Sequence, residues 1–190
     1  MLKRTALALA LFLAAGSARA GINHDSTGVY NQVYLNPLGL AYGFGGLGWE
    51  HAFDHDNSIA LEVSGRGYAG RDYNYYGAGL TGNYRWYLGA DHSRMRGPYV
   101  GPKLYLLNYG FNYDRVDNNG NVVRRNYSNF YAGGGAQAGY QWLFDGGLTL
   151  GVGGEAYFLA GNVDLEPGSP SVNGIVGLNG GLVGSVGYAF

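Results

Sequence analysis

Six charged side chains stand among runs of apolar residues, and their chemistry is the easiest to assign. They are three acids and three bases: Glu50, Glu62, Arg66, Arg85, Lys103 and Glu155. Each lies where polar and apolar residues alternate, so all six are expected on the polar face of a strand. A buried charge without a partner suffers a large desolvation cost. The balance of signs therefore predicts an ion-pair network inside the fold.

Nucleophilic catalysis is the second chemistry to weigh. The sequence His55-Asp56-Asn57-Ser58 holds a base, an acid and a hydroxyl, whereas His24 and His92 stand apart from any such group. Scattered histidines are more often surface residues than general bases. We therefore expect no catalytic residues and no enzyme.

Metal binding has one candidate segment. Asp114, Asp117, Asn119 and Asn121 flank Gly120, as oxygen ligands flank a glycine in a calcium loop. The ordered Asp-x-Asn-x-Asn-Gly pattern and the closing glutamate of such loops are missing. A polar turn is the better interpretation. The chain has no cysteine, and the sequence predicts neither a metal nor another cofactor.

Strands must position these residues, because apolar and polar residues alternate with period two over long stretches. In the last stretch Val176, Leu178, Leu182, Val186 and Phe190 alternate with smaller or more polar residues. The same alternation predicts six clear strands, at Ser58–Tyr68, Tyr75–Leu88, Gly97–Tyr109, Asn129–Phe144, Leu148–Ala160 and Ile175–Phe190. Each is long enough for a tilted strand that crosses a membrane.

The segment before residue 54 allows two interpretations. It forms either two strands, Gln32–Leu40 and Gly45–Phe53, or one long strand from Val33 to Phe53. Single-chain bacterial barrels have an even number of strands, which favours two strands here and eight in total. The predicted fold class is all-β, a single eight-stranded antiparallel transmembrane β-barrel.

The facing of the strands supports a lipid environment. With this alternation, the six charges point away from lipid, and a slip of one residue would expose all of them to it. The 36 glycines suit positions inside a small barrel where there is little space for a side chain. The 18 tyrosines suit aromatic girdles at the membrane interfaces. An eight-stranded barrel is only wide enough for side chains, so we expect a plugged lumen.

The N-terminus has the features of an export signal. Lys3 and Arg4 precede the uncharged run Thr5–Gly16, and Ala18-Arg19-Ala20 fits a signal-peptidase site. We expect a cleaved signal peptide at 1–20, an N-terminal tail at 21–29 and the barrel at 30–190. Cleavage would remove three of the 12 basic residues and none of the 13 acidic ones. The remaining chain is acidic, so we expect no nucleic-acid partner.

The lengths of the connections predict the orientation. Phe53–Asn57, Gly89–Arg96 and Phe144–Gly147 are expected as periplasmic turns, and Tyr68–Asn74, Phe111–Ser128 and Gly161–Asn173 as external loops. Four loop arginines are candidate contacts for lipopolysaccharide phosphates: Arg71, Arg115, Arg124 and Arg125. The alternative, which we favour, is that they are simply solvated.

Over residues 30–190 the chain resembles small eight-stranded outer-membrane barrels of the OmpA and OmpX type. The features that carry the resemblance are the terminal Phe190 and the acids and bases expected inside the barrel. The resemblance implies that Phe190 is part of the signal read by the barrel assembly machinery. It further implies a monomer in the bacterial outer membrane, in contact with its lipid and lipopolysaccharide. The expected role is non-enzymatic, in envelope integrity or surface interaction through the external loops. A narrow or gated channel for small solutes and a lipid A-modifying enzyme are the alternatives.

Overall fold

Eight strands make up nearly all of the structure. The computed structural model describes residues 30–38, 44–69, 73–88, 95–116, 122–161 and 176–190, so the predicted signal peptide and tail lie outside the described residues. The strands are β1 (Asn31–Asn36), β2 (Phe44–Ala52), β3 (Asn57–Ala69), β4 (Tyr73–Tyr87), β5 (Gly97–Val116), β6 (Val122–Leu143), β7 (Leu148–Gly161) and β8 (Gly177–Ala189). Among these residues, no helix is long and apolar enough to cross a membrane.

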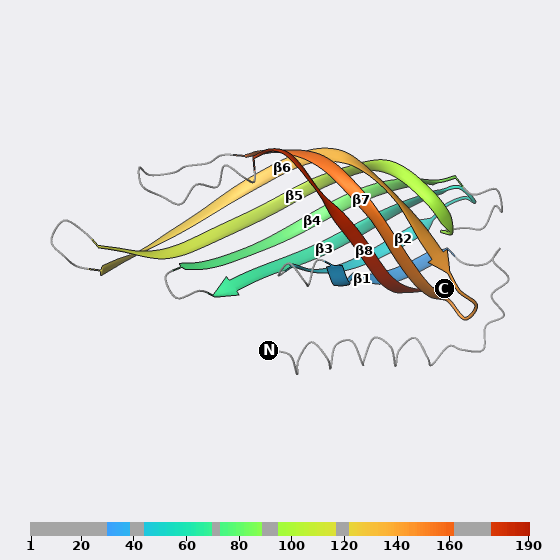
Figure 1. The fold of residues 1–190 in the computed structure, drawn as a ribbon, viewed down its shortest axis with the longest axis horizontal. Coiled ribbons are helices and arrows are strands. Elements are labelled where there is room, and N and C mark those ends of the chain that lie inside the picture. Colours follow the sequence, from blue (N-terminus) through green and yellow to red (C-terminus); the bar gives the residue numbers. More distant parts are fainter. Residues whose placement is uncertain (1–29, 39–43, 70–72, 89–94, 117–121, 162–175) are drawn as a thin grey trace.

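The strands close into one antiparallel barrel in chain order, with β1 hydrogen-bonded to β8 (Figure 1). The expected all-β, eight-stranded antiparallel barrel is therefore confirmed. Two strands rather than one precede residue 54, since β1 and β2 pair from Asn31↔His51 to Asn36↔Gly46. β1 is shorter than the expected Gln32–Leu40, and Pro37 explains its end. Proline has no N–H to donate to the ladder, and residues 37–38 are helical instead of extended.

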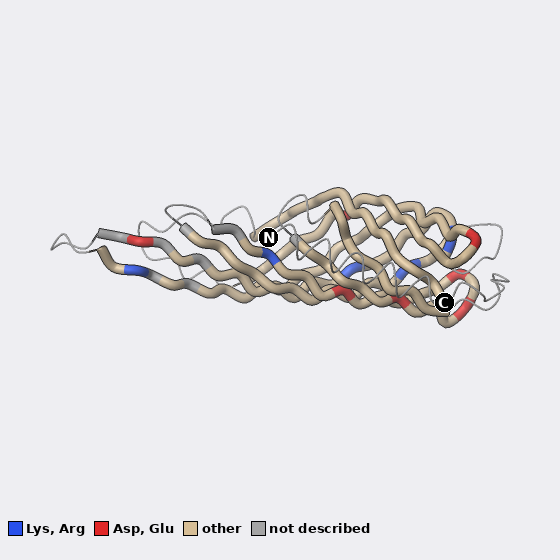
Figure 2. The backbone as a smooth tube through the Cα atoms, turned by 90° about the horizontal axis from the view of Figure 1, so that it is seen from below, with Lys and Arg blue, Asp and Glu red and all other residues tan. Residues whose placement is uncertain are grey.

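Side chains alternate between the two faces of the wall as the sequence predicted. Large apolar residues such as Leu61, Leu104 and Phe158 point outward and are exposed. The inward positions carry polar and aromatic side chains, among them the buried Glu50 and Lys103. Long stretches of the strands carry no charge at all (Figure 2). The barrel is thus apolar outside and polar within.

The two ends of the barrel differ. At one end, here called the short-turn end, the chain turns at Phe53–Asp56 and at Phe144–Gly147, and Phe190 lies beside Asn31. The turn predicted at Phe144–Gly147 is present there, and Gly146 has the positive φ of 88° that glycine tolerates best. The other end is called the hairpin end.

The longest hairpin corrects one prediction. Phe111–Ser128 is not a loop: β5 continues to Val116, β6 begins at Val122, and the two pair as far as Val116↔Val122. They reach farther than the other strands (Figure 1). Tyrosine, phenylalanine and valine favour strands, so the β-propensity of this segment outweighs the polar residues that suggested a loop.

Two clusters of buried side chains fill parts of the lumen. One, near the short-turn end, contains Ala52, Tyr87, Met95, Tyr99 and Ala189. The other, toward the hairpin end, contains Tyr105, Leu107, Tyr109, Tyr131 and Leu159. The inward tyrosines of the sequence thus supply the core, in addition to any role at the membrane interfaces.

Close packing against a tyrosine explains one glycine. Gly48 lies opposite Tyr34 in the β1–β2 register, and a Cβ at Gly48 would collide with the Tyr34 ring. The ring is 2% exposed and fills this level of the lumen. Gly48 is therefore required for packing, and not for a special backbone conformation.

Candidate functional site

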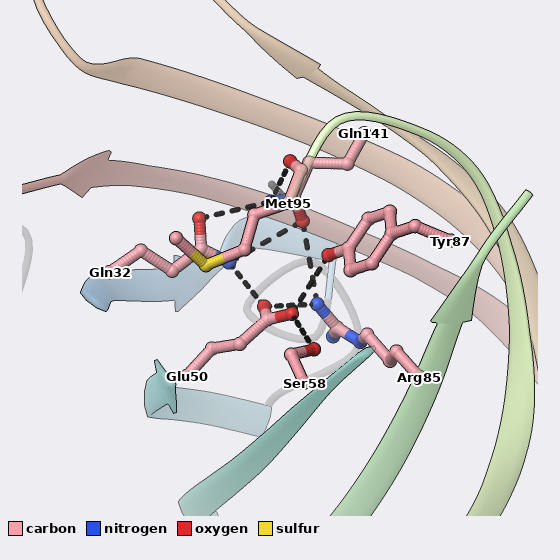
Figure 3. Close-up of polar contacts among 7 residues, drawn as sticks. All are labelled: Gln32, Glu50, Ser58, Arg85, Tyr87, Met95 and Gln141. Carbon is pink, nitrogen blue, oxygen red and sulfur yellow. Dashed lines mark hydrogen bonds and ion pairs between the residues drawn. The ribbon is translucent and has the colours of Figure 1, made fainter. Parts of the chain in front are cut away.

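A buried glutamate organises the polar contacts near the short-turn end (Figure 3). Glu50 is 0% exposed, and both of its carboxylate oxygens accept two hydrogen bonds. Oε1 accepts from Ser58 Oγ at 2.5 Å and from Tyr87 OH at 2.8 Å. Oε2 accepts from Arg85 Nη1 at 2.5 Å and from Gln32 Nε2 at 2.5 Å. Strands β1 to β4 each contribute one or more of these groups.

Gln141 extends the contacts across the lumen to β6. Its Nε2 donates to the Met95 carbonyl oxygen at 2.8 Å and to Gln32 Oε1 at 3.1 Å. Its Oε1 lies 3.4 Å from Arg85 Nη1. We call Gln32, Glu50, Ser58, Arg85, Tyr87, Met95 and Gln141 the Glu50 cluster. It joins five strands and the segment before β5 at one level of the barrel.

The ion pair between Arg85 and Glu50 is the electrostatic centre of this cluster. Arg85 also lies over the Tyr99 ring, with 4.8 Å from Cζ to the ring centroid, and 5.7 Å from that of Tyr34. Cation–π contacts and four hydrogen bonds to Glu50 compensate for burying both charges. Removal of either partner would leave an uncompensated buried charge.

A second ion pair lies farther along the lumen. Lys103 on β5 donates to Glu155 on β7, with Nζ and Oε2 2.7 Å apart. Lys103 Nζ also lies 5.1 Å from the centroid of the Tyr105 ring. This pair is separate from the Glu50 cluster in the contacts of the described residues.

The six predicted lumen charges are therefore distributed over three levels. Four of them form the two ion pairs, Glu50 with Arg85 and Lys103 with Glu155. Glu62 lines the space beside the second pair, and Arg66 stacks over the Tyr75 ring at 4.4 Å, nearer the hairpin end. The structure does not join Glu62 and Arg66 to the pairs through the contacts of the described residues.

Sequence reasoning missed several members of the Glu50 cluster. Gln32, Tyr87 and Gln141 share the inward parity of the charges, and that parity was the signal that could have found them. Met95 carried no such signal, because it lies in a segment predicted as a turn. Its burial follows only from the closure of the barrel.

The candidate catalytic residues are not brought together. His55 is exposed in the turn between β2 and β3, whereas Ser58 is 0% exposed and donates its hydroxyl to Glu50. His24 and His92 lie outside the described residues. The buried, acceptor-bound serine hydroxyl is not placed to attack a substrate.

The calcium-loop candidate falls mostly on undescribed positions. Residues 117–121 lie outside the described residues, and Asp114 is exposed on β5. Within the part of the chain that is described, no three His, Asp or Glu side chains gather closely enough to hold a metal ion.

The predicted loop arginines occupy the longest hairpin or lie outside the described residues. Arg124 is exposed on β6, and Arg115 and Arg125 belong to β5 and β6, where only their backbone is described. Arg71 lies outside the described residues. Phe190, the predicted assembly signal, is 38% exposed, and its backbone exchanges hydrogen bonds with Asn31 at 2.7 Å and 3.0 Å.

Comparison with known proteins yields one structural likeness. No protein-family model matches the chain, and no curated protein matches it. The N-terminal β-barrel domain of Pseudomonas aeruginosa OprF matches with a TM-score of 0.36 and 14% sequence identity, over 85% of this chain and 96% of that one.

Proposed function

We propose that this chain is an integral outer-membrane β-barrel whose lumen is plugged by ion-paired side chains. The observation that supports it is the inverted polarity of the barrel. Outward side chains such as Leu178 and Leu182, which are 83% and 72% exposed, are apolar along much of every strand. In water an apolar surface of this extent would drive aggregation, whereas in lipid it carries no such penalty.

The tryptophans support a membrane position. All three in the chain, Trp49, Trp86 and Trp142, point outward and lie within a few residues of the short-turn end. Trp86 and Trp142 pack on Tyr84 and Tyr140, with ring centroids 4.8 Å and 4.7 Å apart. Such aromatic girdles mark the interface between lipid and water. Short turns are typically periplasmic, so the short-turn end faces the periplasm in this proposal.

The Glu50 cluster supports a plugged lumen. Its side chains come from five strands and meet at one level, where they are linked by hydrogen bonds across the lumen. A path for ions through this level would have to break several of these bonds. The proposed role is accordingly non-enzymatic: envelope integrity or surface interaction through the hairpin end.

Heat modifiability tests the membrane proposal. The mature chain should refold in detergent micelles with a strand-rich circular dichroism spectrum and shift in gel mobility when boiled. A urea-denatured sample in the same detergent is the control and should show no shift. A chain that is monodisperse without detergent and shows no shift would contradict the proposal.

A narrow channel is the second candidate. The lumen contains a cavity of about 440 Å³ on the hairpin side of the Lys103–Glu155 pair, so the interior is not filled at every level. Conductance in planar bilayers separates the two functions. A plugged barrel gives almost no steady current, whereas a channel gives discrete and sustained openings.

A further inference from the structure

The cavity of about 440 Å³ is bounded by side chains of opposite character. Tyr105 and Tyr157 form an aromatic wall, with ring centroids 4.4 Å apart. Leu107 adds an apolar surface next to them, and Glu62 and Thr81 contribute polar groups. Binding sites for small organic molecules combine apolar walls with a few polar groups in cavities of this size.

Among the charged side chains that line the cavity, two are acids and one is a base. Lys103 and Glu155 neutralise each other through their 2.7 Å ion pair. Glu62 makes no hydrogen bond or ion pair with any side chain that the structure describes, so its carboxylate is the excess charge. A partly buried carboxylate of this kind is stabilised by a cation.

A buried hydroxyl group faces the same space. Thr81 is 6% exposed, and its Oγ1 is buried without a hydrogen-bond partner among the described residues. Buried polar atoms are rarely left unpaired, because the lost hydrogen bond to water is not replaced. A bound ligand with a polar group would supply the missing partner.

The part of the cavity wall formed by β8, which pairs with the strand that carries Tyr157, has room for a larger side chain. At Gly181, which lines the cavity, an added Cβ would meet no atom within 4 Å. Its φ is not in the positive range, so a larger residue fits the backbone there. A leucine at position 181 would therefore fill part of the cavity without straining the chain.

We propose that this cavity binds a small organic cation. Its ammonium group pairs with Glu62, and its apolar part lies against Tyr105 and Tyr157. Aromatic faces attract cations as well as apolar groups, so the same wall serves both parts of the ligand. This binding requires only the closed barrel, and it is independent of whether the lumen conducts.

Titration calorimetry with benzyltrimethylammonium tests the proposal on the folded barrel in a non-ionic detergent. The variants are Gly181→Leu, which fills the cavity, and Glu62→Gln, which removes the charge while keeping the shape. Gly65→Leu is the matched control, because its Cβ also has open space but lies on the outward face. Benzyl alcohol and benzoate are the neutral and anionic probes.

We expect saturable binding of the cation to the wild-type protein and to Gly65→Leu. Each of the other two variants should weaken it by about tenfold, the order of one lost ion pair or of a filled site. Heat modifiability establishes that each variant is folded, and Glu62→Gln is the test if Gly181→Leu does not fold. Absence of cation binding, equal binding by all variants, or tighter binding of benzoate would overturn the proposal.

Discussion

At the scale of single residues, the environment of a charge is decided by its partners across the lumen. Glu50 is stable at 0% exposure because four donors from other parts of the chain reach its two oxygens. Arg85 is the only charged donor among them, and it also contacts two tyrosine rings. The stability of the barrel is therefore expected to be sensitive to substitution of either Glu50 or Arg85.

Replacing Arg85 with alanine should open the plug and destabilise the barrel. Glu50 would lose its counter-charge, which costs about 3–5 kcal/mol for a buried pair. We expect a measurable steady current in planar bilayers and a lower unfolding midpoint in urea. Arg124→Ala is the control, since Arg124 is exposed on the longest hairpin. An unchanged conductance in Arg85→Ala would count against the plug.

Asp54 makes the stability of the short-turn end depend on pH in a predictable direction. Desolvation raises its pKa, but hydrogen bonds from the Asn57 side chain and from the backbone N–H groups of Asp56 and Asn57 together lower it by more. Its folded pKa lies below the ordinary value of 3.8. The carboxylate therefore stabilises the turn at pH values above about 4, and this contribution is lost as the pH falls through the folded pKa.

Melting temperatures in detergent from pH 7 to pH 3 measure this contribution. Asp54→Ala should melt below the wild type at pH 7, and the difference should shrink as the pH falls below about 4. Asp145→Ala, which removes an exposed acid from another turn, controls for the general loss of charge. A difference between Asp54→Ala and the wild type that stays constant over this range would contradict the assignment.

At the scale of elements, the barrel consists of strands of very unequal length. β1 has 6 residues, whereas β5 and β6 have 20 and 22. Beyond Tyr73↔Tyr113, β5 has no described pairing with β4, and the described β6–β7 pairing begins at Tyr131↔Gly161. The tip of the β5–β6 hairpin is thus a two-stranded ribbon, and such ribbons are only marginally stable by themselves.

Shortening this hairpin should leave the barrel intact. Replacement of residues 114–124 by Asn-Gly joins Tyr113 to Arg125, which are already paired, through a two-residue turn. We expect heat modifiability and the melting temperature in detergent to stay close to those of the wild type. Loss of the heat-modifiable form would show that the ribbon is needed for closure.

The same variant tests the surface role of the hairpin. It removes Arg115 and Arg124, two of the candidate contacts for lipopolysaccharide phosphates. Co-sedimentation with lipopolysaccharide should decrease if these arginines bind phosphate, and it should be unchanged if they are only solvated.

At the scale of the whole molecule, stability depends on closing the sheet between the first and last strands. β1 and β8 pair over four positions, from Gln32↔Ala189 to Leu35↔Val186, and Phe190 adds backbone hydrogen bonds to Asn31. Closure pairs the backbone N–H and C=O groups of both edge strands. A barrel in lipid requires this, because no water is present there to bond these groups. The chain terminus therefore contributes to closure through its backbone.

The backbone of Phe190 is expected to act in folding and its aromatic ring in assembly, so one substitution can separate the two roles. Phe190→Ala keeps the backbone hydrogen bonds to Asn31, so refolding in detergent micelles should be unchanged. If the aromatic ring is the signal for the assembly machinery, the amount of folded protein in the outer membrane of cells should fall several-fold. Phe144→Ala is the control, because Phe144 is an exposed aromatic at the same end. Equal amounts of both variants in cells would contradict a signal in Phe190.

The sequence by itself determined six of the eight strands, most strand boundaries and the facing of the side chains, whereas the pairing of β1 with β2 settled that two strands precede residue 54. Alternation with period two is a local property, and a barrel with one apolar face must keep it along every strand. The inward position of Glu50, Arg85 and Lys103 followed from parity alone. The length of the β5–β6 hairpin did not follow from parity, because polar residues occur in solvated strands as well as in loops.

Only the tertiary structure decided which inward side chains meet. Parity places a residue on a face, but contact across the lumen depends on the stagger between strands and on closure of the barrel. Glu50 and Arg85 are 35 positions apart, and Gln32 and Gln141 are 109 apart. The cavity beside Glu62 arises in the same way, because its walls come from strands that are brought together only when β8 pairs with β1.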